Sequence, residues 1–226
     1  MLIIVLAIAA TACGSNSGSK AAPPTTTSTK PSTDQRVIGA GLIRPSDLPG
    51  WVHGPKSDGP DPDPAQLARG VAGCENFVKV VRKGDHKRDS ETFEHGDQQV
   101  SDTIEVYPST AAISTQLELS RDPSTLSCER DLFRKLLTVR LHSTVDKLDV
   151  SPIAVNDLGD DEIAFRITAS VNMAGQTIDL LTDEVGVQVG RFALSFGVYG
   201  TTSAQLAELE TTLLPKLVER MKQAGA

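Results

Sequence analysis

The three cysteines of this chain are the residues whose positions predict chemistry most directly. Cys13 directly follows the apolar run Leu2–Ala12 and directly precedes the polar stretch Gly14–Ser19. A bacterial lipoprotein signal has this same order: an apolar segment, small residues, a cysteine and then a soluble stretch. In such a signal the thiol of the cysteine carries a diacylglycerol. We therefore predict that residues 1–12 are a signal peptide and that Cys13 is lipidated.

Other interpretations of this N-terminal segment exist. A transmembrane helix needs roughly 20 apolar residues, and this run is shorter and ends in Gly, Ser and Asn. A buried core helix would not be followed by a long polar stretch. An ordinary cleaved secretion signal, which would leave Cys13 without a role and the protein secreted, is the main alternative. Lipidation predicts a protein tethered to the outer face of the cytoplasmic membrane, where acyl chains hold it while its body stays in water.

Cys74 and Cys128 remain as an even pair once Cys13 is acylated. Outside the cytoplasm such a pair usually forms a disulfide. A crosslink over this separation stabilises the fold by about 4 kcal/mol in the chain-entropy model. Two separate buried thiols are the alternative. A metal site is disfavoured, because neither cysteine has a second Cys or a His at ligand spacing.

Two acidic clusters contain residue types that bind metals. Residues 85–97 include His86, His95 and several carboxylates, but Lys87 and Arg88 would oppose a cation, so a solvated charged loop is predicted. The second cluster, Asp157 with residues 160–162, lacks the spaced oxygen ligands and central glycine of a calcium loop. Neighbouring carboxylates on a turn also point apart. We predict no metal and no cofactor.

Motifs for nucleophilic catalysis are absent from the sequence. It contains no Gly-x-Ser-x-Gly elbow and no Ser-x-x-Lys. No catalytic residue is proposed, and the chain is predicted not to be an enzyme. Trp51, the one tryptophan, is a candidate for lining a ligand pocket, since such pockets favour aromatic walls. The alternative is that Trp51 seals the edge of the core.

The composition indicates one globular domain with an aliphatic core. The chain has 226 residues, of which 39% are hydrophobic, 23% charged and only 4% aromatic. Its formal net charge is −7. Nucleic acid is excluded as a partner, because its recognition needs a concentrated positive surface. The acidic balance also argues against a surface that lies flat on anionic lipid.

The elements that must position these residues follow from composition and periodicity. Residues 13–37 are rich in Ser, Thr, Pro and Gly and are predicted to be a disordered tether, with residues 38–226 as the single domain. Pro215 is expected to bend or split the last helix. Strands that cluster with short turns indicate an α+β fold, with an antiparallel sheet of about five to six strands flanked by helices. Helices are predicted at 63–83, 109–119, from 122 onward and at 204–222, and strands at 98–107, 146–155, 161–173, 176–189 and 191–199.

Three stretches carry a resemblance to known proteins: residues 42–51 (LIRPSDLPGW), the strand 184–191 (EVGVQVGR), and the strand 192–199 followed by one long helix. Together they resemble actinobacterial exported lipoproteins of the LpqN type and the extracellular sensor domain of actinobacterial serine/threonine kinases. The resemblance spans about Val37 to Met221. It implies an antiparallel sheet flanked by helices, with a groove offered to molecules or proteins of the cell envelope. It supplies no catalytic residues.

These observations lead to one expectation about function and two alternatives. The expectation is a membrane-anchored, non-enzymatic binding or sensor-like module that takes up a small apolar or envelope-derived ligand. The first alternative is a module that docks another envelope protein. The second is a hydrolase with an unrecognised site.

Overall fold

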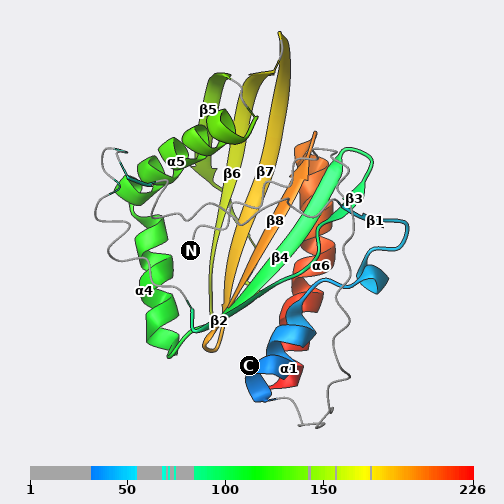
Figure 1. Ribbon diagram of the computed structural model, residues 1–226. Helices are drawn as coiled ribbons and strands as arrows, with labels where there is room; N and C mark the ends of the chain where they lie inside the picture. Colours follow the sequence, from blue (N-terminus) through cyan, green and yellow to red (C-terminus); the bar gives the residue numbers. More distant parts are fainter. Residues whose placement is uncertain are drawn as a thin grey trace, which may run out of the picture.

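The centre of the structure is an eight-stranded sheet in which all pairings are antiparallel (Figure 1). This computed structural model describes residues 32–54, 68, 69, 71, 74, 84–141, 144–155, 157–173 and 175–226. The strand order is β1-β3-β4-β8-β7-β6-β5, and β2 also pairs with β4. The predicted α+β class is confirmed, with more strands than expected. The strands are β1 (Val52–His53), β2 (His86–Asp89), β3 (Phe93–His95), β4 (Gln98–Val106), β5 (Thr144–Pro152), β6 (Asp161–Met173), β7 (Gln176–Val189) and β8 (Phe192–Gly200).

The extra strands lie in a segment that the sequence analysis treated as a charged loop. Residues 85–97 contain β2 and β3, so the loop prediction is wrong there. All four residues of β2 are exposed, and three of them are charged. A strand of this kind has neither the apolar alternation nor the β-branched residues by which strands are recognised. It forms because β4 offers it a free edge for backbone hydrogen bonds, as the pairing of Lys87 with Glu105 illustrates.

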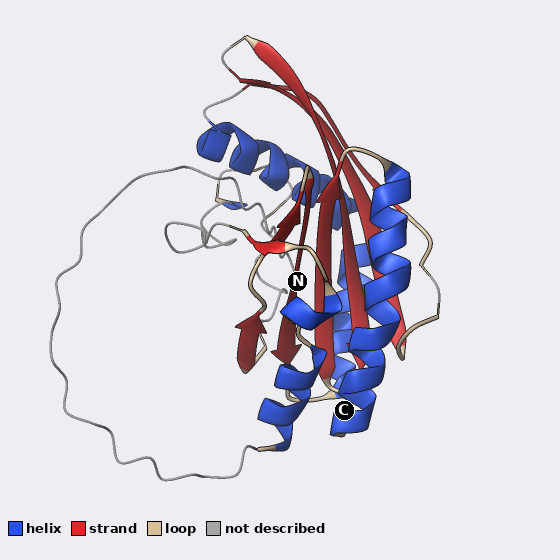
Figure 2. Ribbon diagram, turned by 90° about the vertical axis from the view of Figure 1, so that its right-hand side faces the viewer, coloured by secondary structure: helices blue, strands red, loops and turns tan. Residues whose placement is uncertain are grey.

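Helices cover both faces of the sheet (Figures 1 and 2). On one face, the α6 face, α1 (Thr33–Gly41) packs beside the long α6 (Ser203–Ala224). The short 3-10 turn η1 (Pro45–Asp47) follows α1. On the other face, the α5 face, α4 (Thr110–Arg121) and α5 (Pro123–Leu141) follow each other directly. The sheet is thus the middle layer of three.

The main hydrophobic core lies on the α6 face. Strands β4, β7 and β8 alternate with period two, so every second side chain meets the apolar stripe of α6. Leu213 and Leu217 of that stripe are buried, whereas Pro215 between them is exposed. The helix is continuous through Pro215, so the prediction of a split is wrong. Packing of the leucines holds the two halves in one helix despite the missing N–H donor of proline.

The ordered domain begins earlier in the chain than predicted. Helix α1 begins at Thr33, and the Ser32 hydroxyl and Gln35 side chain form a capping box at its N-terminus. Val37, predicted to be the last residue of the tether, is fully buried in the core. Residues 33–37 are therefore part of the domain. Residues 13–31, with Cys13, lie outside the described residues.

The predicted disulfide is present. Cys74 and Cys128 are joined by an S–S bond of 2.00 Å, and both are buried. The bridge packs against Leu132 of α5 in a small apolar cluster. Most of the helix predicted at 63–83 lies outside the described residues. Among the described helices, none is both long enough and apolar enough to span a membrane.

Candidate functional site

The central strands carry polar side chains on the α5 face, opposite the main core. The same strands that place valine, leucine and phenylalanine against α6 place hydroxyl, amide and carboxyl groups on the other side. We call this polar set the polar platform. It consists of Gln99, Ser101 and Thr103 of β4, Ser195, Gly197 and Tyr199 of β8, and Thr182 and Glu184 of β7.

The strand register arranges the polar platform in rows across the sheet. Tyr199 lies between Gln99 and Thr182 in one row. Gly197 lies between Ser101 and Glu184 in the next. Side chains directly opposite each other in such a pair are about 5 Å apart. The members of the polar platform are therefore immediate neighbours.

Burial distinguishes the polar platform from an ordinary solvent-facing sheet surface. Ser101 and Thr182 are each only 5% exposed. A buried polar group is costly unless it forms a hydrogen bond. Thr103 satisfies this requirement, since its hydroxyl donates to Asp89 Oδ1 at 2.6 Å. The hydroxyls of Ser101 and Thr182 have no hydrogen-bond partner within the part of the chain that the structure describes.

A small hollow opens above these two hydroxyls. Its volume is ≈ 10 Å³, about the space of one water molecule. Gly197, one of the lining residues, lets the Glu184 carboxyl group lie close over β8, because a Cβ at that position would lie 3.2 Å from Glu184 Oε1. The hollow is lined by Thr92, Gln99, Val100, Ser101, Thr182, Gly197, Val198 and Tyr199. The site can therefore offer hydroxyl and amide groups to a polar ligand atom.

Two carboxyl groups on the α5 face are close enough to influence each other. Burial raises the pKa of Glu129, on α5, to about 7. Burial also raises the pKa of Glu184 well above its ordinary value, and the charges of Glu129 and Asp183 add to the rise. Neither glutamate forms an ion pair with a lysine or arginine of the described residues. Burial without a paired cation therefore favours the protonated form of each carboxyl group.

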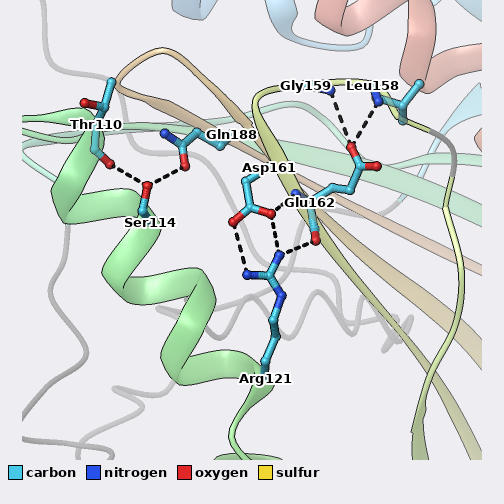
Figure 3. A network of polar contacts seen from close by, with 8 residues as sticks. All are labelled: Thr110, Ser114, Arg121, Leu158, Gly159, Asp161, Glu162 and Gln188. Carbon is cyan, nitrogen blue, oxygen red and sulfur yellow. Dashed lines mark hydrogen bonds and ion pairs between the residues drawn. The ribbon is translucent and has the colours of Figure 1, made fainter.

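A network of polar contacts fixes α4 to the sheet beside the polar platform (Figure 3). Arg121, at the end of α4, donates two hydrogen bonds to the Asp161 carboxylate, at 2.5 and 3.1 Å. The Ser114 hydroxyl donates to the Thr110 carbonyl and lies 3.2 Å from Gln188 Oε1. This bidentate pair and the serine bridge set the position of α4, and with it the beginning of α5.

The acidic clusters singled out in the sequence have structural roles. Asp161 binds Arg121, and the Glu162 carboxylate accepts the N–H groups of Leu158 and Gly159 (Figure 3). In the other cluster, β2 carries His86 and β3 carries His95. No group of three or more potential metal-binding side chains gathers among the described residues.

Trp51 lies away from the polar platform. It is partly buried against the core of the α6 face, and its ring lies 5.6 Å from that of His95. It does not line the hollow. The arrangement fits the alternative interpretation, a residue that seals the edge of the core. A ligand pocket at Trp51 stays a prediction.

Sequence reasoning did not find the polar platform. The alternation of β4 and β8 was visible, but alternation with polar residues is also the pattern of a sheet face open to water. What makes this face different is that Ser101 and Thr182 on it are buried. That burial depends on tertiary contacts that no local pattern encodes.

The solved structures similar to this chain include two with weak overall likeness. No protein-family model matches the chain, and no curated protein matches its sequence. The extracellular domain of PknH from Mycobacterium tuberculosis is similar over 68% of this chain and 76% of its own, with 9% identity and a TM-score of 0.35. The Ran-binding protein Mog1p of Saccharomyces cerevisiae is similar over 62% of this chain and 90% of its own, with 11% identity and a TM-score of 0.23. We base no functional conclusion on either likeness.

Proposed function

We propose that this protein is a lipid-anchored, non-enzymatic binding module of the cell envelope, and that the polar platform is its ligand site. The observation that carries the proposal is the hollow lined by Ser101 and Thr182, two residues that are each 5% exposed and whose hydroxyls have no hydrogen-bond partner within the described part of the chain. Buried polar groups are rarely left in that state unless water or a ligand satisfies them. A bound molecule would supply the missing partners.

The proposed location rests on the cysteines. Cys13 stands in the context of a lipoprotein signal. The Cys74–Cys128 disulfide fits an oxidising compartment outside the cytoplasm. The resemblance of residues 42–51 and 184–199 to LpqN-type lipoproteins and kinase sensor domains points to the same compartment. Together they support a protein held at the outer face of the membrane.

The chemical groups that line the hollow limit the kinds of ligand that it can bind. The hollow is bordered by hydroxyl and amide groups of Ser101, Thr182, Tyr199 and Gln99. Of the ligands expected from the sequence, this favours an envelope-derived molecule with hydrogen-bonding groups over a wholly apolar one. Apolar parts of the same molecule would contact other surfaces.

Native mass spectrometry of protein isolated from an actinobacterial membrane tests the proposal. We expect the mass of a diacylglycerol on Cys13 and a noncovalent adduct on the folded domain. Thr182→Val keeps the size and shape of the side chain but removes the hydroxyl that faces the hollow, so it should release the adduct. Cys13→Ser should move the protein from the membrane to the medium without removing the adduct.

Thr168→Val is the matched control for Thr182→Val. Thr168 is an exposed strand residue on the α6 face, next to β7. It should leave the adduct in place. A protein without an adduct, or an adduct kept equally by both valine variants, would contradict a ligand site on the polar platform.

A further inference from the structure

The segment that precedes the sheet lies on the α6 face as a strap. We call residues 32–48 the strap; it contains α1 and η1 and contributes no strand to the sheet. Figure 1 shows α1 (blue) beside α6 (red). Gly41 lies directly on the core, because a Cβ at that position would be 2.6 Å from Met221 Cγ and closer still to Ile104 Cδ1. The strap therefore covers Ile104 and Met221, both of which are fully buried.

One peptide group of the strap is held from both sides. The Ile43 N–H donates to Asp102 Oδ1 at 3.0 Å, and the Leu42 carbonyl accepts a hydrogen bond from Arg220 Nη2 at 3.0 Å. This N–H and this C=O belong to the same trans peptide unit, in which they point in opposite directions. The sheet thus holds the peptide through a carboxyl group of β4, and α6 holds it through a guanidinium.

Arg220 also fixes the η1 end of the strap. Its Nη1 donates to both oxygens of the Asp47 carboxylate, at 3.0 and 3.1 Å. Asp47 in turn accepts the Arg44 N–H at 2.9 Å. The positive charge of Arg220 is therefore paired with Asp47. Asp102 forms no ion pair with a lysine or arginine in the part of the chain that the structure describes.

Asp102 is a buried carboxyl group with one free oxygen. It is 1% exposed, and its Oδ2 has no hydrogen-bond partner among the described residues. The charged groups that face it are Arg220 from α6 and Asp47 from η1. The other neighbours are uncharged: β8 presents Phe196, and the segment after β2 presents Ser90. A buried carboxylate without a cation of its own is costly, so burial raises the pKa of Asp102 to about 7.

We propose that the strap is a pH-sensitive latch, which stays docked while Asp102 is protonated and is released when Asp102 ionises. Release admits water to the carboxylate and uncovers Ile104 and Met221. The latch does not depend on the proposed ligand site, because the polar platform lies on the opposite face of the sheet. In the lipid-anchored protein proposed above, the strap directly follows residues 13–31. Its release would then lengthen the connection between the domain and the membrane.

The direction of the pH effect follows from proton linkage. With the strap docked, the pKa of Asp102 is about 7, whereas an exposed aspartate has a pKa of about 4. The docked state therefore binds the proton more tightly than the released state. The contribution of Asp102 to docking is fully present below pH 4 and is lost as the pH rises through 7. The ratio of released to docked molecules should rise at least about tenfold from pH 5 to pH 8.

Hydrogen–deuterium exchange measured by mass spectrometry tests the latch in the wild type. Protection factors divide out the pH dependence of the chemical exchange itself, so peptides of the strap can be compared with peptides of β8 at pH 5 and pH 8. We expect the strap to be at least tenfold less protected at pH 8, with a smaller change in β8. Unchanged protection of the strap would overturn the latch. An equal loss in the strap and β8 would also overturn it, because the whole domain would then be opening.

Asp102→Asn assigns the effect to one group. Asparagine keeps an acceptor for the Ile43 N–H but cannot ionise. At pH 8 the strap should therefore be at least tenfold more protected in the variant than in the wild type, and at pH 5 the two should agree. Circular dichroism verifies the fold, and the wild-type comparison decides the question by itself if the variant does not fold.

Glu210→Gln is the matched control. Glu210 is another α6-face carboxyl group, its pKa is raised to about 8, and its charged neighbours are Asp183 and Arg166 rather than groups of the strap. This variant should keep the wild-type pH dependence of strap exchange. If Glu210→Gln protected the strap at pH 8 as well as Asp102→Asn did, or if neither variant protected it, Asp102 would not be the group that controls the latch.

Discussion

At the residue scale, Asp102 of β4 is a carboxyl group held inside the α6 face. It is 1% exposed, and its Oδ1 accepts the Ile43 N–H at 3.0 Å while Oδ2 has no partner. Burial raises its pKa to about 7. Through Ile43 this group holds the segment between α1 and η1 against the sheet. Arg220 of α6 holds the same segment by donating a hydrogen bond to the Leu42 carbonyl at 3.0 Å.

Asp102→Asn tests this role. The amide retains an acceptor for the Ile43 N–H and cannot ionise, so we expect stability within about 1 kcal/mol of the wild type at pH 5. Between pH 5 and 8 the variant should lose less stability than the wild type. Asp102→Ala removes the acceptor and should cost about 1–3 kcal/mol at both pH values. Urea unfolding followed by circular dichroism measures these differences in the free energy of unfolding. A wild-type pH dependence in Asp102→Asn would contradict ionisation of Asp102.

Arg166 and Asp183 form the most buried ion pair among the residues that the structure describes. The Asp183 side chain is fully buried, and Arg166 donates to both of its oxygens, at 2.5 and 2.7 Å. Arg166→Gln leaves this carboxylate without its cation and should cost about 3–5 kcal/mol. Arg130→Gln breaks an exposed pair with Asp131 and should cost less than about 1 kcal/mol. Equal costs in the two variants, measured by urea unfolding, would be inconsistent with this difference in burial.

At the element scale, regular periodicity made some elements predictable. The bounds of β6 and β7 agree with the prediction, because both alternate along their length and Gly175, with a φ of 85°, supplies the turn between them. Helices α4 and α5 follow from their caps and apolar spacing. Strands β2 and β3 were missed, since they form through pairing with β4 rather than through a pattern of their own.

At Pro215, the low helix propensity of proline opposes the tertiary packing that keeps α6 continuous. It lies inside α6, where proline costs about 3 kcal/mol in an isolated helix because it lacks an N–H and its ring crowds the preceding turn. Its side chain is exposed, so replacement loses little packing. Pro215→Ala should therefore raise the free energy of unfolding by about 1–3 kcal/mol. A decrease in urea unfolding would show that proline has a favourable role in this helix.

At the same scale, the disulfide contributes to the free energy of unfolding, and reduction removes that contribution. Cys74 and Cys128 are 54 residues apart in sequence, and chain entropy gives about 4 kcal/mol for such a closed loop. Cys74→Ser with Cys128→Ser should lower the free energy of unfolding by about 2–5 kcal/mol. Adding a reductant should destabilise the wild type and leave the double variant unchanged. If the reductant destabilised both proteins equally, its effect would not come from this disulfide.

At the scale of the whole molecule, buried carboxyl groups set the dependence of stability on pH. The folded-state pKa values of Asp102 and Glu129 are raised to about 7, and that of Glu210 to about 8, mainly by burial. The folded state therefore binds protons more strongly than the unfolded chain between pH 4 and 8. The stability from these groups is fully present below their unfolded pKa and is lost as pH rises through 7 to 8.

Two carboxylates act in the opposite direction. The pKa values of Asp122 and Asp161 are lowered, by hydrogen bonds from Ser124 and Arg121 respectively, so their contribution is lost as the pH falls below about 4. We expect maximal stability near pH 4 and a loss of at least about 2 kcal/mol by pH 8. Thermal unfolding monitored from pH 3 to 9 measures this profile. A maximum at pH 7 or above would contradict the raised pKa values.

The polar platform shows the limit of sequence-based prediction for this molecule. The disulfide and the fold class follow from residue types and spacing, whereas lipidation of Cys13 stays a prediction. The site does not follow from them, because Ser101 and Thr182 are ordinary strand residues in the sequence, and their burial depends on tertiary contacts. Trp51 is a candidate from the sequence because ligand pockets favour aromatic residues, yet its side chain packs against the core of the α6 face.

Fluorine NMR of the mature protein tests the ligand site most directly, because the aromatic residues are few and well placed. The chain has two tyrosines and one tryptophan. Tyr199 lines the hollow, Tyr107 is buried beside Glu105, and Trp51 lies on the α6 face. With 3-fluorotyrosine and 5-fluorotryptophan incorporated, addition of the ligand fraction extracted from host membranes should shift the Tyr199 resonance and leave those of Tyr107 and Trp51 in place. A shift of Trp51 alone, or no shift at Tyr199 while the native adduct forms, would contradict binding at the polar platform.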